Sequence, residues 1–390
     1  MTRAVTVRAM PRVWAAAALP DTVNRPGRPS PFAIRDVGRY VLLPRLFAPT
    51  APGAGNSRIS RGMRRAVLLM IGVGIAVAAV SAPALAAEPG RVPNAPTLPI
   101  EQKYYAPGPW SVTSASAFGC CDSSGSTFDV WYPTDLDRSG TRFPIITWGD
   151  GSYATPAQYA YLLAHLASWG FVVVASESDG TGSGRQILDA AQWMVRQDAE
   201  PSSPFHHRLA TSEVGAVGHS QGATGVLNAM IMSDGLISTA IPIELPAQVY
   251  CLASSLCADT RKLTGGSIFL VNGSADGLIS PSTQPLPWAL TGLQSNSAYY
   301  EAAPAAVGKV WATLNGPDHN DVTGQPGCAA LSVSCANGVW GYLGYPTAWL
   351  MSRLQGDRYA HRAFVDRTGE LFREHTNWTN QHSNIRPRQP

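Results

Sequence analysis

Charged residues are scarce in this sequence: Asp, Glu, Lys and Arg make up only 14% of its 390 residues, whereas apolar residues make up 45%. A chain with so little charge and so many apolar residues is a poor fit to a disordered protein or a nucleic-acid scaffold. Its 37 glycines and 31 prolines follow no collagen-like period and form no long low-complexity run. The sequence therefore predicts a folded, turn-rich protein that is long enough for a sizeable buried core.

The net charge of +3 conceals an uneven distribution along the chain. Residues 1–62 hold ten arginines and two acids, a net charge of +8, without a sustained apolar period. We interpret this stretch as a mis-called or disordered leader, with Met63 as the true start. Without residues 1–86 the chain has 17 basic and 24 acidic residues, a net charge of −7, which argues against a nucleic-acid partner.

An export signal is predicted at residues 63–86. An arginine pair precedes the uncharged run 66–80, and Ala84-Leu85-Ala86 supplies the small residues of a cleavage site. The alternative is a membrane anchor, because the 22 residues 66–87 are all uncharged. The Pro-rich lead-in 87–102 favours cleavage, so we expect a secreted protein without stable membrane insertion.

The cysteines indicate disulfides and not a metal site. The sequence has six cysteines but no C-x-x-C pair and no His–Cys cluster, and an even number in an exported chain is typical of disulfides. Two pairs are close enough in sequence to close small loops: Cys251 with Cys257, and Cys328 with Cys335. The neighbours Cys120 and Cys121 could form a vicinal bridge or pair elsewhere, and the sequence leaves this open.

Strands and helices are expected to alternate over a single domain, residues 103–375, which predicts a mostly parallel sheet with helices on both faces. The strands are expected at 128–132, 143–148, 171–176, 214–217, 240–244, 267–271 and 309–314. The helices are expected at 156–169, 185–196, 221–232 and 347–354. A charged helical stretch to about residue 372 and a polar tail, 376–390, are expected to end the chain.

The strongest functional motif is Gly218-His219-Ser220-Gln221-Gly222, which stands directly between an expected strand and an expected helix. A serine nucleophile of this G-x-S-x-G kind sits on a sharp strand-to-helix turn, where glycine permits close backbone approach. The N-terminus of the following helix then offers N–H groups to a developing oxyanion. Ser220 is therefore the predicted nucleophile.

A serine needs a base and an acid that orients the base, in the chain order Ser, Asp or Glu, His for this kind of fold. Asp276 and His319 each follow an expected strand, so one edge of the sheet could gather them with Ser220. Asp318 or Asp321 is the alternative acid if the strand assignment is wrong.

Two other histidines, His219 and His165, are expected to have structural and not catalytic roles. The His219 side chain is expected to point away from Ser220 on such a turn, and His165 is expected to be a packed core histidine.

An oxyanion hole needs two N–H donors that point toward the developing oxyanion. The backbone of Gln221, next after the nucleophile, is the first candidate, and the turn after strand 143–148 offers Asp150 as the second. Gly149 and Gly151 of this turn, together with Tyr153 as an aromatic wall, are the expected substrate contacts.

These motifs resemble those of actinobacterial cutinases, or polyester hydrolases, and their chlorophyllase-like relatives in the α/β-hydrolase fold. The likeness covers about residues 104–364. It rests on Trp148-Gly149-Asp150-Gly151, the stretch 162–173, the Gly218–Gly222 elbow, the Asp276 loop, Gly316-Pro317-Asp318-His319 and the final helix with residues 357–359. The resemblance implies a Ser220, His319 and Asp276 triad, Gln221 and Asp150 as oxyanion donors, a shallow open cleft without a large lid, ester substrates and no cofactor.

The sequence departs from the usual family pattern at three places. Gln221 stands where Met usually follows the nucleophile, Leu245-Pro246-Ala247 stands where a Trp is usual, and Asp150 replaces the oxyanion-loop Tyr. Ester hydrolysis remains the prediction, whereas the choice between polyesters and small esters stays open.

The predicted protein is thus a secreted serine ester hydrolase without a cofactor and without an assigned metal site, and we expect a monomer. The sequence leaves metal dependence and the oligomeric state open. An acyltransferase using the same triad is one alternative. A non-catalytic surface-binding protein that keeps the fold is another, and only the enzymes would contain an activated serine.

Overall fold

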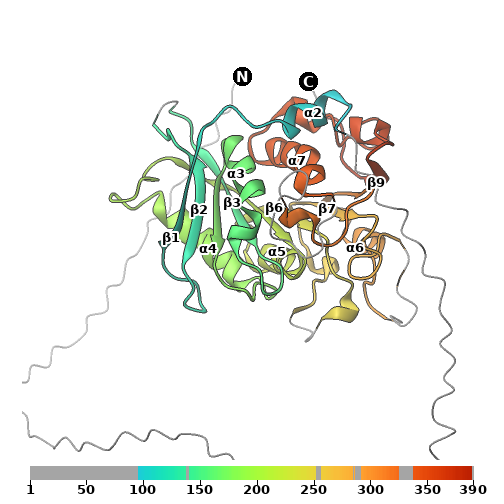
Figure 1. The fold of residues 1–390 in the computed structure, drawn as a ribbon, viewed down its shortest axis with the longest axis horizontal. Helices are drawn as coiled ribbons and strands as arrows, with labels where there is room; N and C mark the ends of the chain where they lie inside the picture. The colour runs from blue at the N-terminus through green and yellow to red at the C-terminus, as the bar shows by residue number, and fades with distance from the viewer. Residues whose placement is uncertain are drawn as a thin grey trace, which may run out of the picture. The chain divides into compact units, whose positions relative to one another are not determined.

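The computed structural model describes residues 95–388 except 138–139, 252–255, 284, 286–290 and 325–336. Within these residues the strands form one nine-stranded sheet in the order β1-β2-β4-β3-β5-β6-β7-β8-β9 (Figure 1). The strands from β4 to β8 in this order are parallel, whereas β1, β2 and β9 pair antiparallel at the two edges. The strands are β1 (Val112–Gly119), β2 (Phe128–Pro133), β3 (Phe143–Gly149), β4 (Val172–Ser176), β5 (Leu209–His219), β6 (Ile237–Ile243), β7 (Ser267–Gly273), β8 (Gly308–Leu314) and β9 (Trp378–Ser383).

Helices cover both faces of the sheet. The α-helices are α2 (Pro99–Tyr105), α3 (Ala160–Ser168), α4 (Arg185–Gln197), α5 (Gln221–Met232), α6 (Asn296–Ala302), α7 (Gly344–Leu354) and α8 (Arg358–His361). Short 3-10 turns occur at η1 (Pro156–Tyr159), η2 (Gln248–Tyr250), η4 (Thr260–Lys262), η5 (Asp321–Thr323), η6 (Val339–Tyr342) and η7 (Glu370–Arg373). This arrangement confirms the mostly parallel sheet flanked by helices of the α/β-hydrolase fold.

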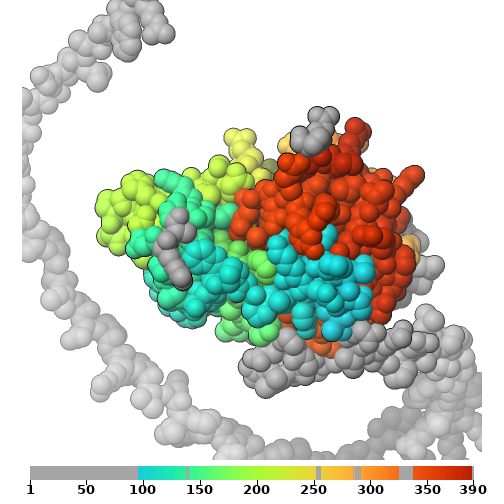
Figure 2. All heavy atoms as spheres, turned by 90° about the horizontal axis from the view of Figure 1, so that it is seen from above, coloured from blue at the N-terminus to red at the C-terminus, as the bar shows by residue number. Residues whose placement is uncertain are grey.

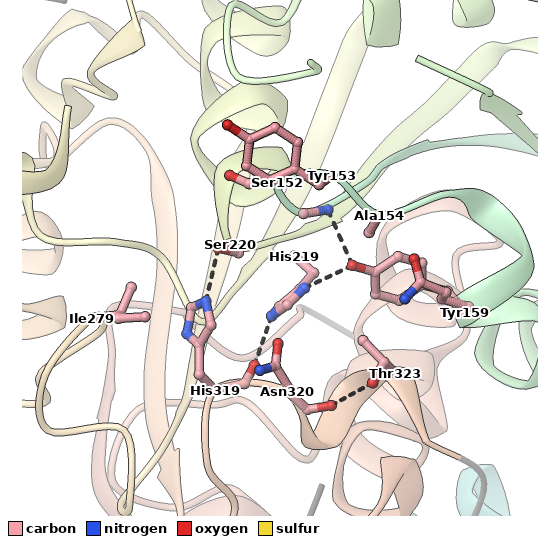
Figure 3. A pocket seen from close by; sticks show the side chains of 12 residues that line it. Ser152, Tyr153, Ala154, Tyr159, His219, Ser220, Ile279, His319, Asn320 and Thr323 are labelled. Carbon is pink, nitrogen blue, oxygen red and sulfur yellow. Dashed lines mark hydrogen bonds between the residues drawn. The ribbon is translucent and has the colours of Figure 1, made fainter. Parts of the chain in front are cut away.

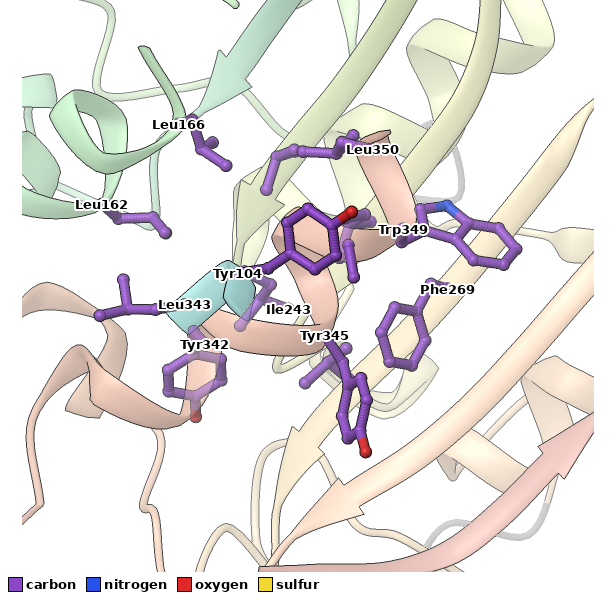
Figure 4. Packing of buried hydrophobic residues seen from close by; sticks show 14 of the residues in the cluster. Tyr104, Leu162, Leu166, Ile243, Phe269, Tyr342, Leu343, Tyr345, Trp349 and Leu350 are labelled. Atoms are coloured by element: carbon purple, nitrogen blue, oxygen red, sulfur yellow. The ribbon is translucent and has the colours of Figure 1, made fainter. Parts of the chain in front are cut away.

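Two apolar cores follow from the alternation of side chains along the strands. Val172 and Val174 of β4 face α4 and α5 on one side of the sheet. Val173 and Ala175, the intervening residues, face α3 and α7 on the other side. Figure 4 shows part of this second core, where leucines of α3 and α7 lie near aromatic residues of β7 and α7. The continuous β-branched run of β4 is therefore explained by burial on both faces.

The expected strands and helices are all present, with shifted boundaries. β5 begins at Leu209 and not at residue 214, and residues 210–213, between the buried Leu209 and Val214, are partly or fully exposed. α7 begins at Gly344, three residues before the expected start. Pro346 lies in its first turn, where proline removes no intrahelical hydrogen bond.

The C-terminal part of the chain differs from expectation. Only α8 and η7 are helical in the expected helical stretch, and the expected polar tail contributes β9, which pairs with β8. Trp378 and Ile385 are buried here and supply the apolar contacts that hold this segment. β1, α2 and α6 were likewise not expected, because their sequences lack a clear apolar period.

The expected lead-in ends in an anchored helix. α2 packs against α7, and Figure 2 shows the cyan residues near position 100 beside the red C-terminal part of the chain. The backbone N–H groups of Ile100 and Glu101 donate to the Glu370 carboxylate at 2.9 Å. The Trp378 indole donates to Glu101 Oε1 at 2.7 Å. The described end of residues 87–102 thus belongs to the folded unit.

The expected leader, the export signal and the Cys328–Cys335 pair lie outside the described residues. Among the helices that are described, none has the length and apolar character needed to cross a membrane.

Candidate active site

Ser220 occupies the sharp turn between β5 and α5. Its backbone has φ 55° and ψ −120°, and its N–H donates to the Ile243 carbonyl at 3.0 Å. The two flanking glycines are required by space, because a Cβ on Gly222 would lie 2.0 Å from the Gly149 oxygen and one on Gly218 would lie 2.5 Å from the Gly222 oxygen. A strained turn of this kind lifts the serine hydroxyl out of the sheet edge.

The structure brings Ser220, His319 and Asp276 into one hydrogen-bonded row. His319 Nε2 lies 2.8 Å from Ser220 Oγ, and His319 Nδ1 lies 2.6 Å from Asp276 Oδ2 (Figure 3 shows the first of these). A carboxylate accepts, so Nδ1 carries the proton and Nε2 is left to accept from the serine hydroxyl. The row arises because Ser220, Asp276 and His319 follow the carboxyl ends of the parallel strands β5, β7 and β8.

The Asp276 carboxyl is 3% exposed but remains ionised. Burial alone would raise its pKa, yet the hydrogen bond and charge of His319 and the Ile279 N–H hold that pKa below its ordinary value. An ionised Asp276 can therefore orient the imidazole and stabilise the imidazolium that forms when His319 accepts a proton.

The alternative acids, Asp318 and Asp321, accept hydrogen bonds from backbone N–H groups around the His319 loop. Asp321 accepts hydrogen bonds from the N–H groups of Asp318, Asn337 and Gly338. Asp318 accepts from the Asn320 N–H, and burial together with Asp321 raises its pKa to about 6. These carboxyl groups fix the His319 loop, whereas Asp276 contacts the imidazole.

His219 points away from Ser220, as expected, and links two loops of the site. His219 Nε2 donates to the His319 carbonyl at 2.7 Å, so Nδ1 is the acceptor and receives the Tyr159 hydroxyl at 2.9 Å. Tyr159 in turn accepts the Gly151 N–H at 3.1 Å (Figure 3). Burial lowers the pKa of His219 to about 3, so the ring stays neutral and keeps these roles. His165 is a buried core histidine, as expected, and bonds to the Tyr104 carbonyl at 2.9 Å.

Asp150 is not part of the cavity wall at Ser220. It is fully buried, its carboxyl accepts the Trp148 indole N–H at 2.7 Å, and its carbonyl accepts the Thr181 hydroxyl. Ser152, two residues later, lines both cavities that open at Ser220. The buried Trp148 needs an acceptor, and this was the signal that could have assigned Asp150 to the interior.

Of the other residues expected at the site, one is buried in packing contacts and the rest line the cavities at Ser220. Gly149 is a packing residue, because a Cβ there would lie 2.5 Å from an Ile187 methyl carbon and 3.0 Å from the Gly222 oxygen. Gly151 and Tyr153 do line the cavity beside Ser220. Tyr153 is 89% exposed and has a φ of 60°, so its ring projects into solvent at the rim. Gln221 lines the second cavity at the N-terminus of α5.

Two cavities meet at Ser220 and share Ser152, Ser220 and Ile279. One has a volume of about 380 Å³ and lies toward His219 and Asn320. The other has a volume of about 340 Å³ and is mainly apolar; its wall includes Pro246, Tyr250, Leu256, Leu278 and Ile279. The space at Ser220 therefore extends to both sides of this serine.

The disulfides are partly as expected. Cys251 pairs with Cys257, and Cys251 forms part of the apolar cavity wall. Cys120 pairs with its neighbour Cys121, which resolves the open choice for these two residues.

A buried glutamate adjoins the site and was not expected from the sequence. Oxygens of Glu244 and Asp276 and a ring nitrogen of His319 lie within 4.8 Å of one another. Such a set of donors could hold a cation, but both ring nitrogens of His319 are already hydrogen-bonded to Asp276 and Ser220. Hydrogen bonding thus accounts for this cluster.

Comparisons with known proteins agree with this geometry. A family model described as PET hydrolase-like matches residues 82–256. Cutinase cut1 of Thermobifida fusca is 26% identical over 68% of this chain and 75% of its own length. Cutinase est1 of Thermobifida alba is 27% identical over 61% of this chain and 72% of its own length.

A third relative has a different substrate in its name. Bis(hydroxyethyl) terephthalate hydrolase of Streptomyces coelicolor is 30% identical over 50% of this chain and 62% of its own length. These matches and the fold together identify the chain as a carboxylic ester hydrolase with the α/β-hydrolase fold that resembles cutinases and polyester hydrolases.

Proposed function

We propose that the protein is a secreted serine esterase that hydrolyses polyesters or their fragments through an acyl-enzyme. Ser220 is the nucleophile, His319 the general base and acid, and Asp276 the residue that orients the imidazole. The observation that carries this assignment is the row of hydrogen bonds of 2.8 Å and 2.6 Å from Ser220 Oγ through His319 to Asp276. No cofactor is required.

The reaction proceeds in two halves. His319 Nε2 accepts the Ser220 proton as Oγ bonds to the ester carbonyl carbon, and the imidazolium then protonates the departing alcohol. Water enters next, gives its proton to His319 and attacks the acyl carbon. The serine oxygen then leaves, recovers the proton from His319 and releases the carboxylic acid.

The oxyanion is stabilised by backbone N–H groups of Gln221 and Ser152. Gln221 begins α5 directly after the nucleophile, where the helix N-terminus favours negative charge. Ser152 replaces Asp150 as the second donor because Ser152 borders both cavities at Ser220, whereas Asp150 lines neither of them.

An extended apolar ester fits the surroundings of Ser220. Six large apolar side chains are strongly exposed among the described residues, and three of them line the two cavities: Tyr153, Tyr250 and Leu278. Exposed apolar residues that gather around a cleft are typical of a binding surface. The cutinases and the terephthalate-ester hydrolase among the relatives favour a polymer or its soluble fragments over a small polar ester.

The assignment of the nucleophile is tested with an active-site serine probe. We expect a fluorophosphonate to label the wild-type protein and the Ser202→Ala control, in which an exposed serine is removed, but not Ser220→Ala. Hydrolysis of nitrophenyl butyrate should fall by about three orders of magnitude or more in Ser220→Ala. Labelling that persists in Ser220→Ala, or a loss of only a few-fold, would contradict the proposal.

The substrate class is tested separately on a polyester film. Leu278→Ser should reduce product release from the film by more than it reduces hydrolysis of nitrophenyl acetate, because only a long apolar chain reaches the rim. Met232→Ser, which removes an exposed apolar side chain outside both cavities, is the matched control. Equal losses on both substrates in Leu278→Ser would favour a small ester.

Export is tested by the mass of the mature protein. Cleavage after Ala86 should give an N-terminus at Ala87, whereas retention of residues 66–87 in a membrane fraction would indicate the anchor.

A further inference from the structure

Glu244 lies at the carboxyl end of β6, directly beside the nucleophile turn. It is fully buried, its N–H donates to the Val271 carbonyl at 2.9 Å, and its φ is 50°, a value that side-chain-bearing residues rarely adopt. Holding such a residue in this conformation costs about 1–3 kcal/mol, and outliers of this kind concentrate at functional sites. The conformation turns the Glu244 carboxyl into the space behind Asp276.

One oxygen of the Glu244 carboxyl is fully occupied. Oε1 accepts the Gly273 N–H and the Tyr342 hydroxyl, each at 2.6 Å. Oε2 is also buried, and no donor reaches it among the residues that the structure describes. A buried carboxyl oxygen without a donor is costly unless that oxygen itself carries a proton and donates it.

The acceptor for such a proton is the neighbouring carboxyl of Asp276. Oxygens of these two buried carboxyl groups lie within 4.8 Å of each other, so ionisation of both is opposed by their mutual repulsion and by the lack of water. Asp276 keeps the charge, since it alone receives the His319 N–H and is slightly exposed. Burial first, and then the charge of Asp276, raise the pKa of Glu244 well above its ordinary value.

We propose that Glu244 is a positioning residue of the esterase: its neutral carboxyl donates an O–H hydrogen bond to the Asp276 carboxylate and so holds that side chain in line with His319. This inference rests on the proposed function of Ser220, His319 and Asp276. Through Oε1 the same residue also fixes Gly273, the last residue of β7, and thereby the start of the loop that carries Asp276.

The titratable groups around Glu244 come from three packed segments. Asp276 follows β7 and His319 follows β8. Tyr342 belongs to η6, and its hydroxyl in turn is influenced by Asp321. Burial raises the pKa of Tyr342, so it stays protonated and remains a donor to Glu244.

Two substitutions separate the proposed role from the alternatives. Glu244→Gln keeps an oxygen for Gly273 and Tyr342 and supplies an amide N–H for Asp276, so it reproduces the neutral acid. Glu244→Met keeps the approximate volume but can neither accept nor donate. Glu101→Gln is the matched control, because Glu101 is also a buried glutamate with a raised pKa but lies in α2 beside Trp378.

The expected results concern kcat and the acidic limb of the pH–rate profile for nitrophenyl butyrate. Glu244→Gln and Glu101→Gln should keep both at wild-type values. Glu244→Met should lower kcat by about 10-fold, with little change in KM, since misplacement of the orienting acid weakens the transition state and not substrate binding. Its acidic limb should also move to higher pH, because Asp276 then bears its full charge beside His319.

A spectroscopic measurement keeps the test decisive even if Glu244→Met does not fold. The infrared spectrum of the wild-type protein near neutral pH should contain a protonated-carboxyl C=O band from Glu244 that is absent from Glu244→Gln. Glu101→Gln should remove the separate contribution of the Glu101 carboxyl, whose pKa is also raised, and retain the Glu244 band. The proposal is overturned if that band is unchanged by Glu244→Gln, or if Glu244→Gln moves the acidic limb to lower pH, which is the result expected from removing an ionised carboxylate. A folded Glu244→Met with wild-type kcat and pH profile would overturn it as well.

Failure of this inference can be distinguished from failure of the proposed function. If the fluorophosphonate does not label wild-type Ser220, the esterase assignment itself fails. If labelling requires Ser220 but the Glu244 variants behave otherwise than expected, only the role of Glu244 fails.

Discussion

At the scale of single residues, the site depends on polar groups that are buried in one protonation state. His219 stays neutral and connects Tyr159 to the His319 carbonyl. Each hydrogen bond in this row has a defined direction, from the Gly151 N–H to the Tyr159 oxygen and from the Tyr159 hydroxyl to His219. The row therefore ties the loop of Gly151 and Ser152, the proposed oxyanion loop, to the loop that carries His319, the proposed base.

Tyr159→Phe breaks this row with little change in volume. It leaves the Gly151 N–H and His219 Nδ1 without their partner, which should cost about 1–3 kcal/mol of unfolding free energy. We expect kcat for nitrophenyl butyrate to fall by about 10-fold, because the oxyanion loop loses its tie to the base. Stopped-flow or steady-state kinetics with urea unfolding would measure both effects, and Tyr161→Phe, at a more exposed tyrosine of α3, should change neither. Wild-type kcat in Tyr159→Phe would show that the tie is unnecessary.

At the scale of elements, the parallel strands were predictable and the edge strands were not. β3, β4 and β7 are buried along their whole length, so they appear in the sequence as short apolar runs. β1 has no buried residue and β9 is buried only at its two ends, so neither appears in the sequence as an apolar run, and their tertiary contacts make them strands. The same reasoning applies to the site. Ser220, Asp276 and His319 follow strands that the sequence predicts. Nothing in the sequence indicates that Glu244, at the end of β6, turns its side chain into the interior.

The contribution of β9 can be measured at Trp378. Its side chain is fully buried beside Phe269 and donates to Glu101, so Trp378→Ala should lower the free energy of unfolding by about 3–5 kcal/mol. Thr379→Ala, at the adjacent exposed position of the same strand, should lower it by less than about 1 kcal/mol. Urea denaturation of the two variants gives the comparison, and similar losses in both would mean that β9 is not anchored through its buried face.

At the scale of the whole molecule, residues far apart in sequence are joined by buried carboxyl groups. Glu101 of α2 accepts from Trp378 of β9, and Glu370 of η7 accepts from the backbone of α2. Burial raises the pKa of Glu101 to about 8, with Glu374 and Glu370 adding to the shift. The folded protein therefore holds a proton on Glu101 that the unfolded chain releases at much lower pH.

This proton makes stability depend on pH in a defined direction. Between the ordinary pKa of 4.5 and about 8 the folded state binds more protons than the unfolded state, so this carboxyl makes stability fall as pH rises through that window. Glu101→Gln should lose less stability than the wild type over the same range, as measured by urea unfolding at its two ends. Parallel pH profiles for the two proteins would exclude Glu101 as the source.

The directed row from Gly151 to His319 has a consequence for the temperature dependence of catalysis. Because the row holds the proposed oxyanion loop and the proposed base in fixed relative positions, we expect little conformational freedom to be lost when an ester reaches the transition state. A substitution that breaks the row should therefore mainly make the entropy of activation for ester hydrolysis less favourable, without altering the chemistry at Ser220.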